Sequence, residues 1–170
     1  MDTGGISGGA GTATITVTGA AAAATHAAKF TLTVGGPGGP ALLSQGRPAT
    51  ASSLESSSFP AGNAVDGNAS TRWASKEGVD PQWLRVDLGA VAGISRVKLV
   101  WEAAYAKSYT IEVSADGTTW TRIYSTTTGN GATDDLTGLS GSGRFVRITG
   151  TVRGTPYGYS LFEMQVYGTA

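Results

Sequence analysis

Short runs in which apolar and polar residues alternate recur along this chain of 170 residues. In one of them, Tyr109, Ile111 and Val113 alternate with polar residues. A period of two places the apolar side chains on one face of a β-strand. Turn-forming pairs such as Asp116-Gly117 follow the runs, and no stretch shows helical periodicity. The sequence therefore predicts an all-β fold, an antiparallel sandwich or jelly roll.

Six such runs are the expected strands of a main domain, residues 41–170. They are Gln82 to Leu88, Ile94 to Trp101, Tyr109 to Val113, Trp120 to Tyr124, Arg144 to Ile148 and Leu161 to Tyr167. Three tryptophans, Trp83, Trp101 and Trp120, lie on these strands. We expect all three to pack in the core, because large aromatic side chains supply much of the buried area of a small domain.

A stretch of glycine and proline, residues 35–40, predicts a flexible linker that separates the main domain from residues 1–34. Two further alternating runs, Thr14 to Thr18 and Phe30 to Val34, predict two strands before the linker. The alanine-rich stretch Ala20 to Ala28 is too short for an isolated helix. We interpret it as a floppy hairpin connection.

Two strands alone cannot bury a face, so residues 1–34 resemble the end of an immunoglobulin-like domain. The unpaired edges of these strands leave three arrangements open. They can dock on the main domain, pair between protomers, or form a loosely attached fragment. We expect a monomer, with pairing of the N-terminal strands as the alternative.

The charge balance excludes two classes of partner. Lys and Arg together number 12, as do Asp and Glu, so the formal net charge is zero. A general electrostatic grip on nucleic acid needs clustered cations, and so does a polybasic membrane anchor. No apolar run approaches the ~20 residues of a membrane-spanning helix. We therefore expect neither nucleic acid nor membrane as a partner.

The chain also lacks the groups that most catalytic schemes need. It has no cysteine, and its one histidine, His26, lies outside the main domain. Asp134 and Asp135 are adjacent, so on a strand they would point to opposite faces rather than act as a catalytic pair. We expect them in a solvated turn, and we expect no enzyme activity.

Residues 63–73 are dense in oxygen-bearing side chains, and Asp66-Gly67 can form a sharp loop among them. Calcium prefers six to eight oxygen ligands from carboxylates, hydroxyls and carbonyls. A turn closed by the aspartate side chain, without an ion, explains the same residues equally well. Residue chemistry alone leaves both interpretations open.

Two segments that join the predicted strands carry tyrosines in a polar setting, Tyr105 in one and Tyr157 and Tyr159 in the other. An aromatic ring with a polar handle suits the binding of a sugar ring, and binding residues concentrate on loops. For each single tyrosine, a packing role is an equally good explanation.

The segment from about Leu42 to Gly168 resembles the discoidin domain, also called the coagulation factor five/eight type C domain. Within that family it is similar to the family 32 carbohydrate-binding modules of bacterial secreted glycoside hydrolases. The residues that carry the resemblance are Gly46 to Ser53, Ala64 to Gly67, Thr71 to Ser75, Gln82 to Gly89, Ser114 to Trp120, Arg144 to Ile148 and Glu163 to Gly168. The resemblance implies a jelly roll of about eight main strands.

The resemblance also implies one structural calcium ion. By position, Asp66 and Glu163 would supply side-chain oxygens and Thr71 its hydroxyl and carbonyl. The carbonyls of Ala64, Asn68 and Phe162 would complete the ligand set. Such an ion would join the loop at Asp66 to the last strand and would stabilise the fold.

Ligand sites in this family lie on loops at one end of the sandwich. The loops around residues 101–109 and 153–161 are similar to those of a subgroup attached to enzymes that act on chitosan and on 1,3-glucans. This implies that Glu102 accepts hydrogen bonds or pairs with a glucosamine ammonium, and that Arg153 donates to sugar oxygens. Tyr157 or Tyr105 would stack on a sugar ring, with Tyr159 in the same loop. Glu55 and Lys76 are further candidates.

The resemblance implies a non-catalytic module that targets a secreted hydrolase to polysaccharide. The positive charge of Arg153 and Lys76 favours a neutral 1,3-glucan slightly over chitosan, and galactosides remain open. A protein- or lipid-interaction module and a structural spacer are the alternatives. Met1 to Gly5 has neither a basic nor an apolar region, so we expect no signal peptide in this sequence, although the implied location is extracellular.

Overall fold

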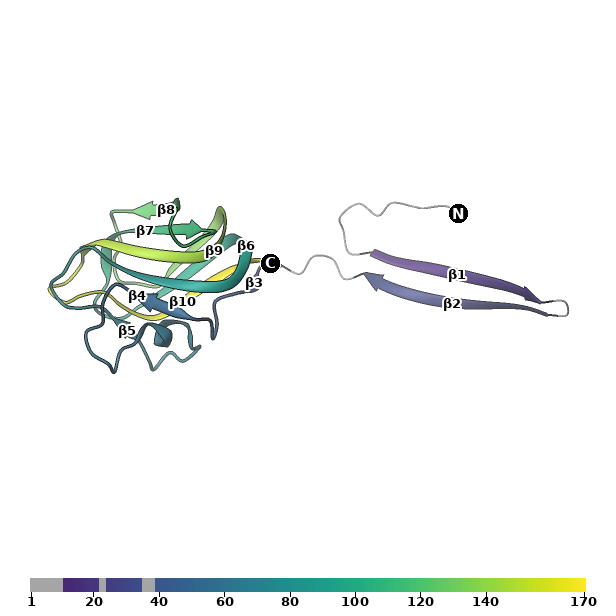
Figure 1. Ribbon diagram of the computed structural model, residues 1–170, viewed down its shortest axis with the longest axis horizontal. Coiled ribbons are helices and arrows are strands. Elements are labelled where there is room, and N and C mark those ends of the chain that lie inside the picture. Colours follow the sequence, from purple (N-terminus) through teal and green to yellow (C-terminus); the bar gives the residue numbers. More distant parts are fainter. Residues whose placement is uncertain (1–10, 22–23, 35–38) are drawn as a thin grey trace. The chain divides into compact units, whose positions relative to one another are not determined.

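The computed structural model describes residues 11–21, 24–34 and 39–170 (Figure 1). The chain divides into two compact units, Met1–Gly39 and Pro40–Ala170. Residues 35–38, most of the predicted linker, lie outside the described residues. In the described part, no helix has both the length and the apolar character needed to cross a bilayer.

The first unit contains one antiparallel pair, β1 (Gly11–Ala21) and β2 (Ala24–Val34). Two strands were expected, but the expectation of a floppy connection over residues 20–28 is wrong, because the pairing continues to Ala21 opposite Ala24. Alanine favours a helix only where the helix is long enough to propagate. Here each further residue instead adds to the hydrogen-bonded pairing of β1 with β2. The resemblance to an immunoglobulin-like domain stays a prediction.

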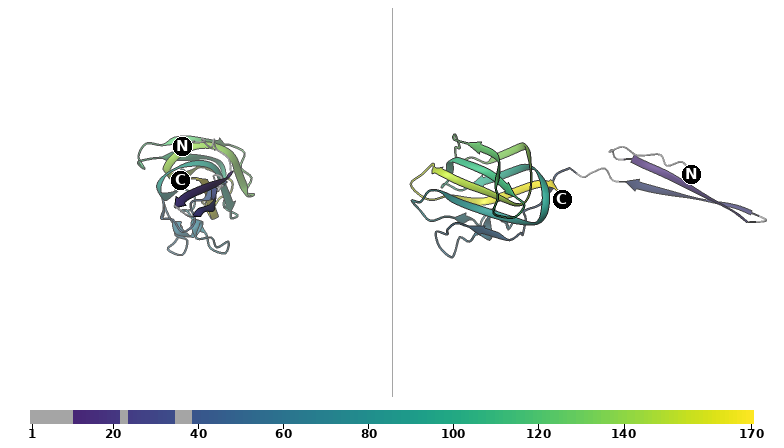
Figure 2. Two further views of the ribbon diagram at one scale, coloured as in Figure 1. Left: turned by 90° about the vertical axis from the view of Figure 1, so that its right-hand side faces the viewer. Right: turned by 45° about the horizontal axis from the view of Figure 1, so that its top comes forward.

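The second unit is almost entirely β, as predicted (Figure 2). Its elements are β3 (Ala41–Leu42), β4 (Ala49–Ala51), a 3-10 helix η1 (Ala61–Val65), β5 (Trp73–Ala74), β6 (Gln82–Trp101), β7 (Ala106–Ser114), β8 (Thr121–Thr126), β9 (Asp134–Arg153) and β10 (Ser160–Thr169). The strands pair in the order β3-β10-β6-β9-β7-β8, with β4 on β6 and β5 on β10. Every pairing is antiparallel.

The two long strands, β6 and β9, run side by side through the centre of this unit (Figure 1). The sequence predicted two separate strands where β6 is continuous. Its pairing with β9 shifts register between Asp87 and Ala92, and Gly89 there has a positive φ of 86°, a conformation that only glycine adopts at little cost. A register shift of this kind bends a strand without ending it.

The core fills with alternate residues of these strands, among them Leu84, Val86, Val97 and Leu99 of β6, which are fully buried. Their alternation is the pattern on which the fold prediction rested. Larger side chains belong to the same core, among them Tyr159 of the β9–β10 loop, which is 2% exposed.

The prediction for the tryptophans is correct only for Trp101, which is 7% exposed. Trp83 and Trp120 are half-buried on the outer surface. For Trp83 the reason is strand alternation, since it directly precedes buried Leu84 and so faces the other way. The guanidinium of Arg147 lies 4.0 Å from the Trp120 ring centre, which covers that ring without burying it.

Asp134 and Asp135 open strand β9, so the expectation of a solvated turn is wrong. Asp134 accepts hydrogen bonds from Trp101 Nε1 at 2.9 Å and from the Tyr109 hydroxyl at 2.7 Å. Burial, and then this carboxylate, raise the pKa of Tyr109. Asp135 faces the other side and pairs with Arg96 at 2.7 Å. The two carboxylates therefore have separate structural roles.

Candidate functional site

A cleft of about 360 Å³ lies where four segments of the second unit meet. The segments are the loop after β4, strand β5 and the loop that follows it, the β6–β7 loop, and the β9–β10 loop. The lining residues are Glu55, Arg72, Ala74, Ser75, Glu77, Glu102, Ala103, Ala104, Tyr157, Gly158, Tyr159 and Ser160. Three glutamates and one arginine give this lining a formal charge of minus two. We call it the acidic cleft.

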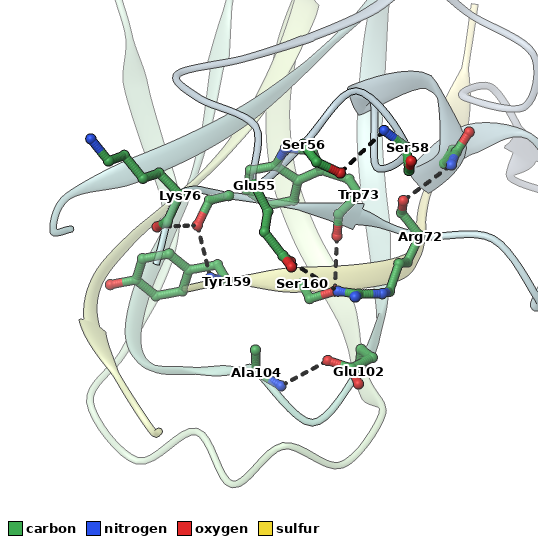
Figure 3. A network of polar contacts seen from close by, with 12 residues as sticks. Glu55, Ser56, Ser58, Arg72, Trp73, Lys76, Glu102, Ala104, Tyr159 and Ser160 are labelled. Carbon is green, nitrogen blue, oxygen red and sulfur yellow. Dashed lines mark hydrogen bonds and ion pairs between the residues drawn. The ribbon is translucent and has the colours of Figure 1, made fainter. Parts of the chain in front are cut away.

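Arg72 is held on three sides, and Figure 3 shows two of the residues that hold it, Glu55 and Ser160. Its guanidinium lies 3.8 Å from the centre of the Phe59 ring, donates to Ser160 Oγ at 3.0 Å, and is 3.5 Å from Glu55 Oε2. Ser160 Oγ in turn donates to the carbonyl of Trp73 at 2.9 Å. The one cation of the lining is therefore already fixed by the protein, and it neutralises only one of the three carboxylates.

Glu102 begins the β6–β7 loop and is half-buried. Its Oε2 accepts the backbone N–H of Ala104 at 3.1 Å (Figure 3). The loop is tied to β10 through two further bonds, from Glu102 N to Ser160 O at 3.0 Å and from Ser160 N to Ala104 O at 2.7 Å. The carboxylate of Glu102 is thus oriented by one of its oxygens, and the other oxygen remains available as an acceptor.

The β9–β10 loop places a tyrosine at the opening of the acidic cleft. Tyr157 is 55% exposed, whereas Tyr159 is buried and its hydroxyl donates to Asp80. Burial, and then the Asp80 carboxylate, raise the pKa of Tyr159. Arg153 also binds Asp80, at 3.0 Å, and its guanidinium donates to the carbonyls of Pro156 and Tyr157. These contacts fix the loop that carries Tyr157.

Four of the residues predicted to bind ligand therefore line one cleft: Glu55, Glu102, Tyr157 and Tyr159. Tyr159 contributes from a buried position, so its ring has no free face for stacking. The other three predicted residues, Tyr105, Arg153 and Lys76, are not among the lining residues.

Each of these three has a structural reason to lie outside. The ring of Tyr105 packs against Gly131 and Gly154, where a Cβ atom would come within 2.7 Å and 2.2 Å of it. Arg153 is committed to Asp80 and to loop carbonyls. The side chain of Lys76 points away from Arg72 and Glu102 in Figure 3.

Sequence reasoning missed several lining residues, above all Arg72 and Glu77. Arg72 stands in the segment Thr71 to Ser75, which served only as a mark of the family. A signal was present, because the arginine ends a segment rich in polar residues, 63–72, and binding residues concentrate on loops.

Gly158 allows two walls of the acidic cleft, the β9–β10 loop and the segment at Ser75 and Lys76, to pack closely against each other. A Cβ atom at this position would lie 2.7 Å from the Ser75 carbonyl and 2.9 Å from that of Lys76. We expect Gly158→Ala to push the β9–β10 loop outward, to destabilise the domain by about 1–3 kcal/mol, and to weaken any ligand bound in the cleft. Thermal denaturation and titration calorimetry measure the two effects. Gly62→Ala is the matched control, because that position is open, and a similar loss there would contradict this explanation.

The predicted metal ligands lie around the loop after η1. Asp66 Oδ2 accepts the Thr71 hydroxyl at 2.7 Å and Oδ1 accepts the N–H of Asn68 at 2.8 Å. Glu163 is 6% exposed, and its Oε1 is buried without a hydrogen-bond partner. Burial first, and then the Asp66 carboxylate, raise the pKa of Glu163, while the N–H groups of Gly67 and Asn68 act in the opposite direction.

This donor set fits a calcium ion. A buried carboxylate oxygen without a partner is costly, and a cation would satisfy it. Among the described residues, no group of three or more His, Cys, Asp or Glu side chains lies close enough to hold a metal. Additional ligands at this loop would therefore be neutral oxygens, which calcium accepts. The carbonyls and the hydroxyl predicted from Ala64, Asn68, Thr71 and Phe162 are of this kind.

Comparisons with known proteins agree with the fold. The family model of the F5/8 type C domain matches residues 48–164. Two chitosan-binding modules of a chitosanase/glucanase from Paenibacillus sp. IK-5 are similar in structure. Module 1 is 57% identical, with a TM-score of 0.73, and the match covers 75% of this chain and 99% of that module. Module 2, solved in complex with chitotriose, is 51% identical, with a TM-score of 0.72 and coverage of 74% and 99%.

More distant relatives are also carbohydrate-associated proteins. A family 32 module of NanJ from C. perfringens, solved with galactose, shares the fold at 24% identity, with a TM-score of 0.67 and coverage of 75% and 98%. The polysaccharide lyase 8 family protein HylA from Enterococcus faecalis is 40% identical over 73 residues. That match covers 43% of this chain and only 5% of HylA. By the family model and by its structural relatives, the chain belongs to the F5/8 type C, or discoidin, domain family.

Proposed function

We propose that this chain is a non-catalytic carbohydrate-binding module whose acidic cleft binds a glucosamine oligosaccharide of the kind that chitosan provides. The observation that carries the proposal is the lining itself, in which three glutamates face one arginine that the protein already holds. A protonated amine of glucosamine would find carboxylate acceptors there, and hydrogen bonds to charged groups are the stronger ones.

This ligand differs from the neutral glucan that the sequence slightly favoured. That preference rested on the positive charge of Arg153 and Lys76, and neither residue lines the cleft. Arg153 pairs with Asp80 at 3.0 Å, so its charge is compensated next to the loop. The similarity to two chitosan-binding modules, above 50% identity, supports the same choice.

The exposed ring of Tyr157 at the cleft opening can cover the apolar face of a sugar ring. A single open site of this size is expected to bind with a Kd between millimolar and micromolar, about −4 to −8 kcal/mol. Such affinity suffices for a module that raises the local concentration of an attached, secreted hydrolase on its polysaccharide.

The proposal is tested by titration calorimetry with three trisaccharides of matched length. Glucosamine trisaccharide should bind, and its affinity should fall as salt is raised, because salt screens the carboxylates. N-Acetylglucosamine trisaccharide and the 1,3-glucan laminaritriose should bind at least tenfold more weakly, about 1.4 kcal/mol. Equal affinity for all three, or preference for laminaritriose, would overturn the glucosamine assignment, and binding of none would overturn the carbohydrate site.

We also propose that Asp66 and Glu163 hold a structural calcium ion, with Thr71 and the carbonyls of Ala64, Asn68 and Phe162 as further ligands. The support is the buried, unpartnered Oε1 of Glu163 beside a second carboxylate. The ion would neutralise this pair and join the Asp66 loop to β10. It would have no part in chemistry on a ligand.

A further inference from the structure

A second cleft, of about 220 Å³, adjoins the acidic cleft. The two share Arg72 and Glu102 as lining residues. The rest of the second lining is Ser58, Phe59, Asn63, Ser70, Thr71 and Phe162. None of these six carries a charge. We call it the hydroxyl cleft, since four of the six bear a hydroxyl or an amide that can bond to sugar hydroxyls.

The walls of the hydroxyl cleft are held by the protein. Asn63 Nδ2 donates to the Arg72 carbonyl at 3.1 Å, and Thr71 Oγ1 bonds to Asp66. Phe59 lies against the guanidinium of Arg72 at 3.8 Å. A surface that is already ordered loses little side-chain entropy when a ligand binds.

Two of its serines offer free hydroxyls. Ser58 and Ser70 use their backbone N–H groups in local turns, to Ser56 Oγ and Asn68 Oδ1. Both residues are exposed, and within residues 39–170 no hydrogen bond of either hydroxyl to another protein group is found. Hydroxyls beside two aromatic side chains, Phe59 and Phe162, are groups that can bind the hydroxyls and the ring face of a sugar unit.

We infer that the hydroxyl cleft is a second sugar subsite, in which a further unit of the same oligosaccharide is bound through its hydroxyls and its ring face. The chain of sugars would pass over Arg72 and Glu102, the residues common to both clefts. The inference rests on the proposed function of the acidic cleft. It adds that the binding site extends beyond that cleft, and that the residues of the extension recognise the sugar without a charged group of their own.

The test compares glucosamine trisaccharide with the hexasaccharide by titration calorimetry. A site that is three sugar units long can bind a hexamer in about four registers. This statistical factor alone raises the affinity about fourfold over that of the trimer. We expect a further gain of about tenfold, equivalent to about 1.4 kcal/mol. Because the six residues that only the hydroxyl cleft contributes carry no charge, this further gain should persist at high salt, while the affinity for the trimer falls.

Two variants block the hydroxyl cleft, Ser70→Trp and Ser58→Trp, and either one should remove the tenfold gain while the trimer affinity stays that of the unmodified chain. Ser57→Trp is the control, because this exposed neighbour lines neither cleft, and it should keep the gain. A gain no larger than the statistical fourfold, or one that survives both blocking variants, would overturn the second subsite and leave the proposed function standing. Failure of the trimer to bind the unmodified chain would instead overturn the proposed function, and this inference with it.

Discussion

Replacement of Glu102 by glutamine is expected to weaken the binding of glucosamine trisaccharide by about a hundredfold. Hydrogen bonds to charged groups contribute about 1.5–3 kcal/mol, and the upper part of that range corresponds to this factor. Glutamine keeps an oxygen that can accept the N–H of Ala104, which Glu102 Oε2 accepts at 3.1 Å. The loop should therefore keep its conformation, and the loss should report the charge alone. Titration calorimetry measures the affinity, and thermal denaturation checks the fold.

Asp135→Asn is the matched control, since it removes one carboxylate from an exposed ion pair with Arg96, and neither residue lines the cleft. An exposed pair contributes little to stability because solvent screens it, and its loss should leave the affinity for the trisaccharide unchanged. The salt dependence separates the two variants further, because Glu102→Gln should bind with a smaller dependence on salt. Equal affinities of Glu102→Gln and the unmodified chain would show that the carboxylate does not contact the sugar.

The strands could be predicted because strand alternation and turn residues are local features. Leu84, Val86, Val97 and Leu99 alternate in the sequence and are buried in the core. The continuity of β6 could not be predicted, since it depends on where β9 changes register, a non-local property. Trp83 was assigned to the wrong face because its size suggested burial, whereas its position next to Leu84 determines its direction.

The candidate site was predictable only in part, for a different reason. Glu102 and Tyr157 stand on loops at one end of the sandwich, where ligand sites of this family are expected, and they line the acidic cleft. The contribution of Arg153 could not be judged from the sequence, because its partner Asp80 lies 73 residues away. That the charge of Arg72 is already held by the protein can be seen only in the structure, where Phe59, Glu55 and Ser160 surround its guanidinium. Ion pairs between residues of different loops therefore decide which charged side chains remain free to bind a ligand.

Removal of calcium with EDTA is expected to lower the melting temperature by about 10 °C. A ligand present at a hundred times its Kd stabilises the folded state by about 2.7 kcal/mol, and a domain of this size shifts by roughly 4 °C per kcal/mol. The physical reason is Glu163, which is 6% exposed and has one carboxylate oxygen without a partner. Without the ion, this buried carboxylate lies next to Asp66 with no cation among the described residues to balance the two charges. Differential scanning calorimetry with calcium, and with EDTA, measures the shift.

Glu163→Gln distinguishes a bound ion from a general effect of the chelator. The variant should melt at the same temperature in calcium and in EDTA, because it lacks the charge that holds the ion. In EDTA it should be at least as stable as the unmodified chain, since an amide has no charge to desolvate, whereas in calcium it should be less stable. Asp135→Asn should respond to EDTA as the unmodified chain does. If the unmodified chain melts at one temperature under both conditions, the calcium site is contradicted, and the buried carboxylate of Glu163 must then be accommodated by the protein alone.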